Sequence, residues 1–223
     1  PYKKGDVGAS MKNVFTTMKE IGADKPMLIY IISYFFYIDG VHTIISMSTS
    51  YGTNLGLDST GLLLALLVTQ FVAFPFSILF GRLAEKYDTG KLILTCIAAY
   101  TGITVFAVFM KAQWQFWVLA IFVGMFQGGI QALSRSYFAK IVPLERSGEY
   151  FGLMDICGKG ASFMGTTVVG LASQAFGSIN IGVSAIVFLF LAGALFFMKT
   201  EHSGSESTKN QENIVMGQQM FHD

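Results

Sequence analysis

Charged residues are scarce in this sequence. Asp, Glu, Lys and Arg supply 13% of the 223 residues, about half the share that is usual in a soluble domain, whereas hydrophobic residues supply 52%. There are only two cysteines, Cys96 and Cys157. Both lie in apolar segments, so neither a disulfide framework nor a zinc site is indicated.

Several chemical signatures are missing as well. The sequence has no phosphate-binding loop, no nucleophile paired with a base and no metal-ligand spacing, so we expect no enzyme activity, no metal and no cofactor. Its basic residues cluster at the ends of apolar segments instead of alternating with aromatic residues, so nucleic acid is not an expected partner. The start carries neither an initiator Met nor a signal-peptide pattern, and we expect the chain to be part of a longer protein.

What the sequence does contain is long apolar stretches. They form blocks of about 20 residues, the length that a helix needs to cross a hydrocarbon core of about 30 Å. In such a block the helix satisfies its own backbone, which lipid cannot do. The six expected spans are Met27–Met47, Gly61–Phe80, Leu92–Met110, Phe116–Ser134, Phe151–Ala175 and Ile179–Met198. The predicted fold is therefore an all-α membrane protein, a bundle of six transmembrane helices over residues 26–199.

Polar segments flank the predicted bundle. Residues 1–25 are basic and carry apolar residues at helical spacing from Met11 to Ile21, which predicts an amphipathic helix on the membrane surface. Residues 200–223 are polar and low in aromatic residues, which predicts a disordered tail. Of the 15 Lys and Arg residues, 13 lie in these flanks, at Lys199 beside the tail and in the loops after the second and fourth spans, against Lys111 alone on the opposite side. We therefore expect a multi-pass protein of a bacterial inner membrane, with both termini in the cytoplasm.

The loop from Gly81 to Lys91 resembles the signature between the second and third helices of each major-facilitator half. That signature has a glycine, an acid four residues later, and basic residues around a turn. Here Glu85 replaces the usual Asp, and Asp88 stands where a Gly is common. The glycine lets two helices approach closely, and the acid can meet the N-terminus of a neighbouring helix. The alternative interpretation is a generic basic cytoplasmic loop.

A second pattern begins at Arg135 and continues through Pro143, Arg146 and Gly148 to Phe151. It resembles the connection between the fourth and fifth helices of a major-facilitator half, where charged residues at the helix ends hold the open and closed states. The two patterns occur in the expected order, which is more specific than either alone. The residues expected to form a charge network that gates the cytoplasmic side are Arg82, Glu85, Lys86, Arg135, Arg146 and Glu149.

Further segments narrow the resemblance to one family. They are Tyr37–Ile45, Gln70–Pro75, Phe80–Glu85, Trp114–Trp117, Gln127–Ser136 and Gly158–Lys159. Together they resemble the UMF family of major-facilitator proteins, which includes the autophagy-related vacuolar amino-acid effluxers. The resemblance runs from about residue 12 to residue 198 and corresponds to spans seven to twelve of that family, with the basic lead as the linker between its halves. It implies the C-terminal half of a secondary transporter that exports small solutes such as amino acids by alternating access.

Asp39 and His42 are the most unexpected polar residues of the first span. Asp39 is 12 residues into the span, about 18 Å along it, and His42 follows on the same face. A carboxylate at that depth must be neutralised, paired or turned toward water. We expect both residues to face the central cavity, and one or both of them to bind substrate or a proton. The alternative is a structural role, with Asp39 hydrogen-bonded to a neighbouring helix.

Gln127, Gln131 and Arg135 recur every four residues on one face of the fourth span. In the resembled fold, the first and fourth helices of each half line the central cavity. We therefore expect Gln127 and Gln131 to line the pathway, whereas Arg135 belongs to the gate. The alternative for the two amides is interhelical hydrogen bonding, at about 1 kcal/mol each.

Asp155 and Lys159 lie four residues apart in the fifth span and are expected to pair with each other inside the membrane. Two classes of function remain open at this point. One is a secondary transporter, partnered by membrane lipid, a small solute with proton coupling, and an N-terminal six-helix half. The other is a six-span scaffold or regulatory half-transporter that carries nothing.

Overall fold

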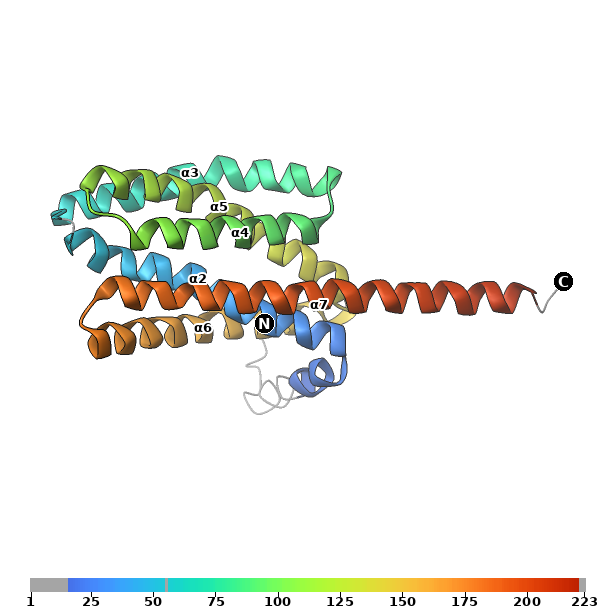
Figure 1. Cartoon of the computed structure of the whole chain (residues 1–223). Helices are drawn as coiled ribbons and strands as arrows, with labels where there is room; N and C mark the ends of the chain where they lie inside the picture. The colour runs from blue at the N-terminus through green and yellow to red at the C-terminus, as the bar shows by residue number, and fades with distance from the viewer. Residues whose placement is uncertain (1–15, 55, 221–223) are drawn as a thin grey trace, which may run out of the picture.

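The protein is helical throughout the part that the computed structural model describes, residues 16–54 and 56–220, and no strand occurs there. A short helix at residues 16–23 comes first, and six long helices follow (Figure 1). They are α2 (Lys25–Asn54), α3 (Ser59–Lys86), α4 (Thr89–Val108), α5 (Gln113–Ile141), α6 (Ser147–Phe176) and α7 (Ile179–Met220). A single 3-10 turn, Leu144–Arg146, joins α5 to α6.

Five of the long helices are apolar enough to cross a membrane. These stretches are Lys25–Thr53, Ser59–Lys86, Thr89–Val108, Gln113–Ile141 and Asn180–Thr200. The helix that does not qualify, α6, is 30 residues long, but Lys159 and several glycines and hydroxyl residues lower its hydropathy. The prediction of a multi-helix membrane protein is confirmed, whereas hydropathy alone supports five of the six predicted spans.

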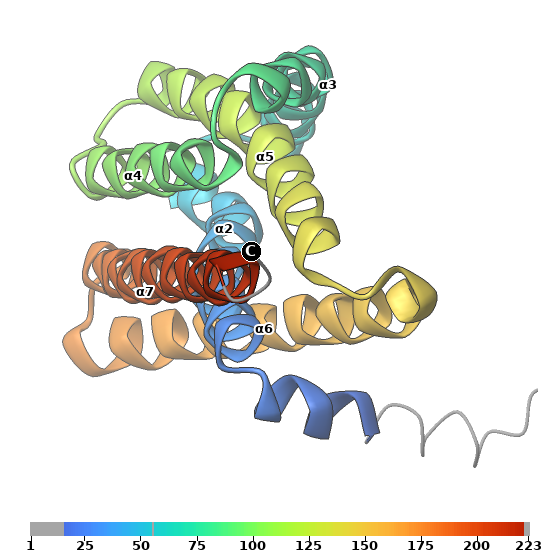
Figure 2. The same ribbon diagram turned by 90° about the vertical axis from the view of Figure 1, so that its right-hand side faces the viewer.

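The six helices form two groups of three. α3 and α4 pack against α5, and α2, α6 and α7 pack against one another. Contacts between α4 and α7, and weaker ones between α2 and α5, join the two groups. Figure 2 shows the bundle nearly along α7, with α3, α4 and α5 above α2, α6 and α7.

Local chemistry sets where two of these helices begin. The Asp58 carboxylate accepts a hydrogen bond from the Gly61 backbone N–H at 2.8 Å, and Asp88 does the same for Lys91 at 3.0 Å. Each therefore satisfies one of the free N–H groups in the first turn of its helix, α3 and α4 respectively. The turn between α3 and α4 is consequently only Tyr87 and Asp88.

Glycine allows α5 to lie directly on α3. A Cβ at Gly124 would lie 2.6 Å from the carbonyl oxygen of Thr69, and one at Gly128 would lie 2.5 Å from that of Ala73. Side chains at either position would push the helices apart, so the four-residue glycine spacing permits the close approach.

The outer face of α3 is apolar and uncovered. Phe71 and Phe74 are 77% and 71% exposed, and Leu63, Leu67 and Ile78 are also exposed. A continuous apolar surface of this kind suits lipid tails or an apolar protein surface. It agrees with the placement of α3 in a membrane.

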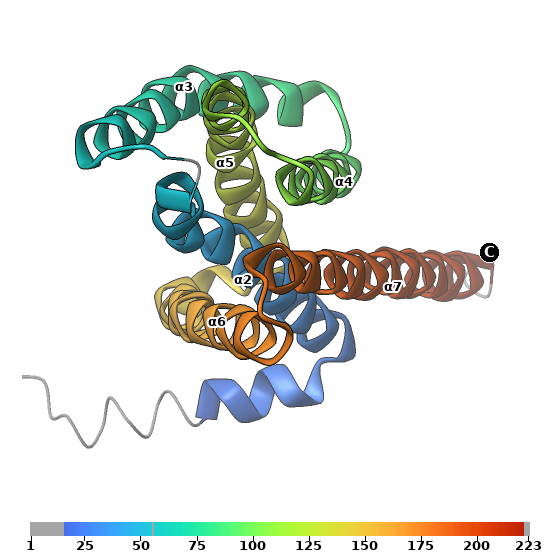
Figure 3. The same ribbon diagram turned by 60° about the vertical axis from the view of Figure 1, so that its left-hand side comes forward.

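The flanking segments are helical where the structure describes them. Within the predicted linker helix, Thr17 and Ile21 are buried against the bundle, whereas Met18 is exposed; residues 1–15 lie outside the described residues. Figure 3 shows this short helix beside α6. At the other end, the tail predicted to be disordered instead continues α7 as a helix to Met220, which projects beyond the bundle in Figure 1. Residues 221–223 are not described.

Candidate functional site

Asp39 lies on α2 and is fully buried. Its Oδ1 atom accepts hydrogen bonds from the backbone N–H of Gly165 on α6 at 2.9 Å and from the Thr43 hydroxyl at 3.3 Å. Its Oδ2 atom has no hydrogen-bond partner within the described residues. Asp39 therefore joins α2 to α6 through one oxygen and leaves the other available.

Glycine is required opposite this carboxylate. A Cβ on Gly165 would lie 2.5 Å from Asp39 Oδ1 and would overlap the Thr43 hydroxyl. Only a residue without a side chain lets the α6 backbone N–H reach the acid at this point. The absence of a side chain at Gly165 is therefore what brings the acid and the N–H together.

His42 makes a second contact to the same helix. Its Nδ1 atom lies 2.8 Å from Ser162 Oγ on α6, and its ring is half-buried. The structure thus places the two polar residues predicted for the first span side by side along the seam between α2 and α6. Both bond to α6 in this conformation.

The two predicted glutamines, Gln127 and Gln131, lie on α5 and are half-buried. The Gln127 carbonyl oxygen Oε1 is buried and has no hydrogen-bond partner among the described residues. An amide oxygen left unpaired in this way carries a cost of about 1–3 kcal/mol. A hydrogen-bond partner for Gln127 Oε1 would therefore remove this cost.

A buried hydroxyl cluster that the sequence reasoning missed joins α2 to α5. Tyr30 donates a hydrogen bond to the backbone carbonyl of Ser134 at 2.7 Å, and the Tyr37 hydroxyl lies 2.7 Å from Ser134 Oγ. Tyr30 and Tyr37 are seven residues apart, so they share one face of α2. Two tyrosines at that spacing in a membrane span can indicate a buried hydrogen-bonded contact with another helix, because buried hydroxyls need partners.

The predicted pair between Asp155 and Lys159 does not occur in this structure. Asp155 instead bonds Arg135 on α5, with Arg135 Nη2 2.7 Å from Asp155 Oδ1. Helical spacing places Asp155 and Lys159 on one face of α6, but the Asp155 carboxylate forms its ion pair with the Arg135 guanidinium of α5 instead. Arg135, predicted as a gate residue, thereby ties α5 to α6.

Arg146 lies in a second charged group, at the start of α6. Its guanidinium bonds both carboxylate oxygens of Glu20 at 2.8 and 2.7 Å, and Glu149 at 2.7 Å. Thr17 and Tyr150 add hydrogen bonds to the same group. Hydrogen bonding to Arg146 lowers the pKa of Glu20, and hydrogen bonding to Glu20 and Glu149 raises the pKa of Arg146. The short N-terminal helix is docked to α6 by this group.

The remaining predicted gate residues stand apart from both groups. Arg82, Glu85 and Lys86 lie in the last turns of α3, and no ion pair within the described residues joins them to Arg135 or Arg146. The predicted single network is thus divided in this conformation.

The loop signature before α4 also differs in detail from the prediction. A Cβ placed on Gly81 would meet no atom of the described residues within 4 Å, so this glycine is not at a close helix contact here. The residue that caps the next helix is Asp88, and not Glu85.

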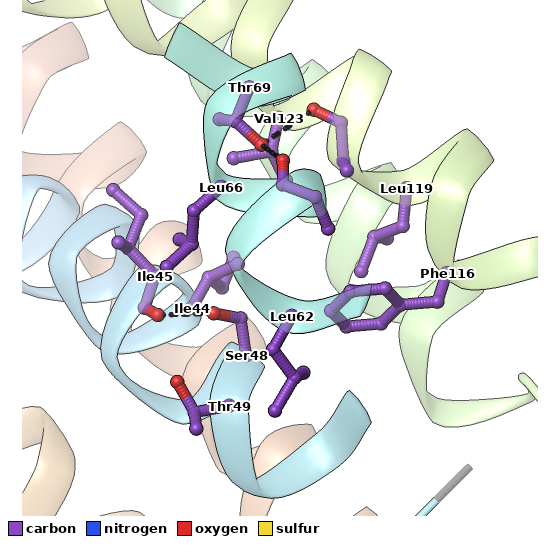
Figure 4. Close-up of a pocket in the computed structure, with 12 residues that line it drawn as sticks. Ile44, Ile45, Ser48, Thr49, Leu62, Leu66, Thr69, Phe116, Leu119 and Val123 are labelled. Carbon is purple, nitrogen blue, oxygen red and sulfur yellow. Dashed lines mark hydrogen bonds between the residues drawn. The ribbon is translucent and has the colours of Figure 1, made fainter. Parts of the chain in front are cut away.

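A small pocket opens between α2, α3 and α5 (Figure 4). Its walls are mostly apolar, with Ile44, Leu62 and Phe116 among the lining residues. The hydroxyls of Ser48 and Thr69 in its wall already donate to carbonyls, Ser48 to that of Ile45 at 2.6 Å. None of the predicted site residues lines this pocket. It separates α2 from the α3–α5 pair.

Buried polar groups on long apolar helices are typical of membrane transporters, and comparison with known proteins agrees. Residues 3–209 match the family described as "Vacuole effluxer Atg22 like". The chain belongs to this family. Its members are transporters and not enzymes, and the chain is accordingly a multi-pass integral membrane protein.

Three relatives show the range of the Atg22-like family. The MFS-type transporter YxiO of Bacillus subtilis is 43% identical over 204 residues, which cover 92% of this chain and 48% of that protein. Autophagy-related protein 22-1 of Aspergillus clavatus is 24% identical over 96% of this chain and 37% of its own length. Autophagy-related protein 22 of Cryptococcus neoformans is 26% identical over 78% and 34%. The chain thus spans about half or less of the relatives it matches.

Proposed function

We propose that this chain is the C-terminal half of a major-facilitator secondary transporter that exports small solutes, such as amino acids, by alternating access. The other half would supply six further helices, and the substrate site would lie between the halves. The length of the relatives supports this, since the chain spans 48% of YxiO. In this arrangement α6 supplies the remaining span, the fifth in chain order, because 30 residues of helix are about 45 Å long.

The observation that carries the proposal is the unpartnered oxygen of Asp39. A buried acid whose second oxygen has no partner within the described residues is costly if ionised, but a proton on that oxygen removes the charge. Asp39 is thus suited to take up and release a proton as its surroundings change. His42, bonded to the same helix, is the neighbour that would respond to the change.

The two charged groups support a gating role at the cytoplasmic ends of the helices. Arg135 with Asp155 holds α5 to α6, and Arg146 with Glu20 and Glu149 holds α6 to the N-terminal helix. In the proposed cycle these groups close in one state and separate in the other. Groups of this kind bias a two-state equilibrium by about 1–3 kcal/mol. Arg82, Glu85 and Lys86 would take part in the state that this structure does not represent.

The orientation follows from the distribution of basic residues. With 13 of 15 Lys and Arg residues on one side, we propose that both termini and the turn at Tyr87 and Asp88 face the cytoplasm of a bacterial cell. Lys111, at the short connection between α4 and α5, would then be outside.

The test is transport by the complete protein in proteoliposomes, with Asp39→Asn as the variant. Uptake and exchange are measured for a panel of radiolabelled amino acids, with and without a proton gradient. Asn can still accept the hydrogen bonds of Gly165 and Thr43, so folding should be retained. We expect gradient-driven accumulation to disappear while solute exchange persists.

Asp58→Asn is the matched control, because it makes the same change at an exposed helix cap where Asn serves as well as Asp. Wild-type pH dependence and accumulation in the Asp39→Asn protein would show that Asp39 is a structural link only. Absence of transport of every amino acid by the wild-type protein would instead favour the non-transporting scaffold.

A further inference from the structure

One positive charge on α6 is left over once the ion pairs are assigned. Arg135 occupies the carboxylate of Asp155. Lys159, one turn further along α6, is exposed and has no ion pair or hydrogen bond to any residue that the structure describes. Arg135, Asp155 and Lys159 together therefore carry one net positive charge.

Lys159 is exposed and lies at the edge of the α6 face that meets α5 and α2. Asp155 precedes it by four residues and Ser162 follows it by three, and these spacings place all three on one helix face. Asp155 bonds Arg135 on α5, and Ser162 contacts His42 on α2. Figure 2 shows the C-terminal part of α5 descending to the start of α6.

The polar strip on α6 is distinct from an apolar one. Thr166, seven residues after Lys159, continues the polar strip and is half-buried. Ile156 and Phe163 form the neighbouring strip and are 57% and 76% exposed, as expected of side chains that face lipid or apolar protein. The helix thus has separate surfaces for apolar and for polar surroundings.

Depth separates Lys159 from the basic residues at the helix ends. It lies eight residues after Phe151, the first residue of the predicted span, which places it about 12 Å into that span. A charged side chain so far along a membrane helix faces the interior of the protein or a water-filled path. Lys199, by contrast, comes at the end of the apolar part of α7, where it can reach the membrane surface.

We propose that Lys159 binds the carboxylate group of the transported solute. An ammonium group donates up to three hydrogen bonds and is matched by a carboxylate. In this conformation Asp155 is held by Arg135, which leaves Lys159 free for an incoming anion. Ser162, three residues after Lys159, and His42, which contacts Ser162, are polar groups that suit the rest of the solute. This inference rests on the proposed transport function and names the chemical group that the pathway recognises.

The first experiment compares acids with their amides. KM values for alanine and phenylalanine, and for alaninamide and phenylalaninamide, are measured with the complete protein in proteoliposomes. In the Lys159→Gln variant we expect KM for the two acids to rise about 10- to 100-fold, the size of a lost charge-assisted hydrogen bond, and KM for the amides to stay within about twofold. Lys159→Arg should retain part of the preference, and Lys199→Gln should match the wild type.

Two results would overturn the proposal even where amino acids are transported. One is a wild-type protein that handles acids and amides alike. The other is an equal loss for acids and amides in Lys159→Gln, which would show that Lys159 pairs with an acidic side chain or a lipid phosphate.

A second experiment does not depend on transport. A Thr166→Cys reporter on the same strip is labelled with a thiol reagent in a background without other cysteines. We expect alanine, but not alaninamide, to slow the labelling, and Lys159→Gln to remove this protection. If neither alanine nor phenylalanine protects the reporter while Lys159 is present, the assignment of Lys159 is wrong whatever the transport assay shows.

Discussion

Replacing Gly165 by Ala should break the link between Asp39 and α6. The added methyl group would lie 2.5 Å from Asp39 Oδ1 and would overlap the hydroxyl of Thr43. Because both neighbours belong to the same helix, α2, either the carboxylate must rotate away or α6 must shift. In both cases the hydrogen bond from the Gly165 N–H to Asp39, now 2.9 Å, is lost or lengthened.

Three terms set the size of the effect: two destabilise the protein and one partly offsets them. Overpacking of this kind costs about 1–3 kcal/mol, and a hydrogen bond to a charged group contributes about 1.5–3 kcal/mol. Ala within a helix recovers about 0.5–1 kcal/mol relative to Gly. We therefore expect the free energy of unfolding to fall by about 2–5 kcal/mol.

Cys96 provides the assay, because it is fully buried and should react with a thiol-reactive fluorophore only on unfolding. Thermal unfolding is followed in a Cys157→Ala background. Gly160→Ala is the control on the same helix, since a Cβ there meets nothing within 4 Å, and it should be neutral or slightly stabilising. Adding Thr43→Ala to Gly165→Ala should restore part of the loss. Equal melting of the Gly165→Ala and Gly160→Ala proteins would refute the reasoning.

Two further predictions concern the docking of the N-terminal helix and the membrane topology. Glu20→Gln should speed hydrogen exchange at residues 16–23 about two- to fivefold, as for a partly exposed ion pair, while Glu145→Gln should not. Hydrogen bonding to Arg146 lowers the pKa of Glu20 below its ordinary 4.5. The ion pair should therefore keep the N-terminal helix docked on α6 at pH values above 4.5, and the helix should be released as the pH falls through the lowered pKa of Glu20. For the topology, single cysteines at positions 88 and 145 should be labelled in intact cells only by membrane-permeant reagents; labelling by an impermeant reagent would reverse the orientation.

The candidate site was found in part from the sequence because its residues are out of place in apolar segments. Asp39, His42 and Gln127 stand out there whatever the tertiary structure. Their partners could not be found in the same way, since Gly165 contributes only a backbone N–H and has no chemical signature of its own. The sequence predicted that Asp39 faces the central cavity. Only the packing of α6 against α2 showed that Asp39 accepts a hydrogen bond from the Gly165 backbone N–H.

Ion pairing shows the same division. Spacing along one helix brings Asp155 and Lys159 onto a common face, and a sequence can show no more than that. Which cation occupies the carboxylate depends on how α5 lies across α6, and there Arg135 is at 2.7 Å. Likewise, the sequence placed Arg146 and Glu149 near a helix end, but docking of the N-terminal helix brought Glu20 to them.

The sequence by itself determined that this protein is helical and lies in a membrane, because block length and apolar composition are local properties, and lipid leaves a helix as the only way for such a block to satisfy its backbone. It also determined the family resemblance. The tertiary structure alone decided which helices touch, where glycine permits an approach such as that of Gly124 and Gly128 to α3, and which charge remains unpaired. Those properties depend on side chains from distant parts of the chain meeting in space, and no local pattern along the chain encodes which of several equivalent partners will be nearest.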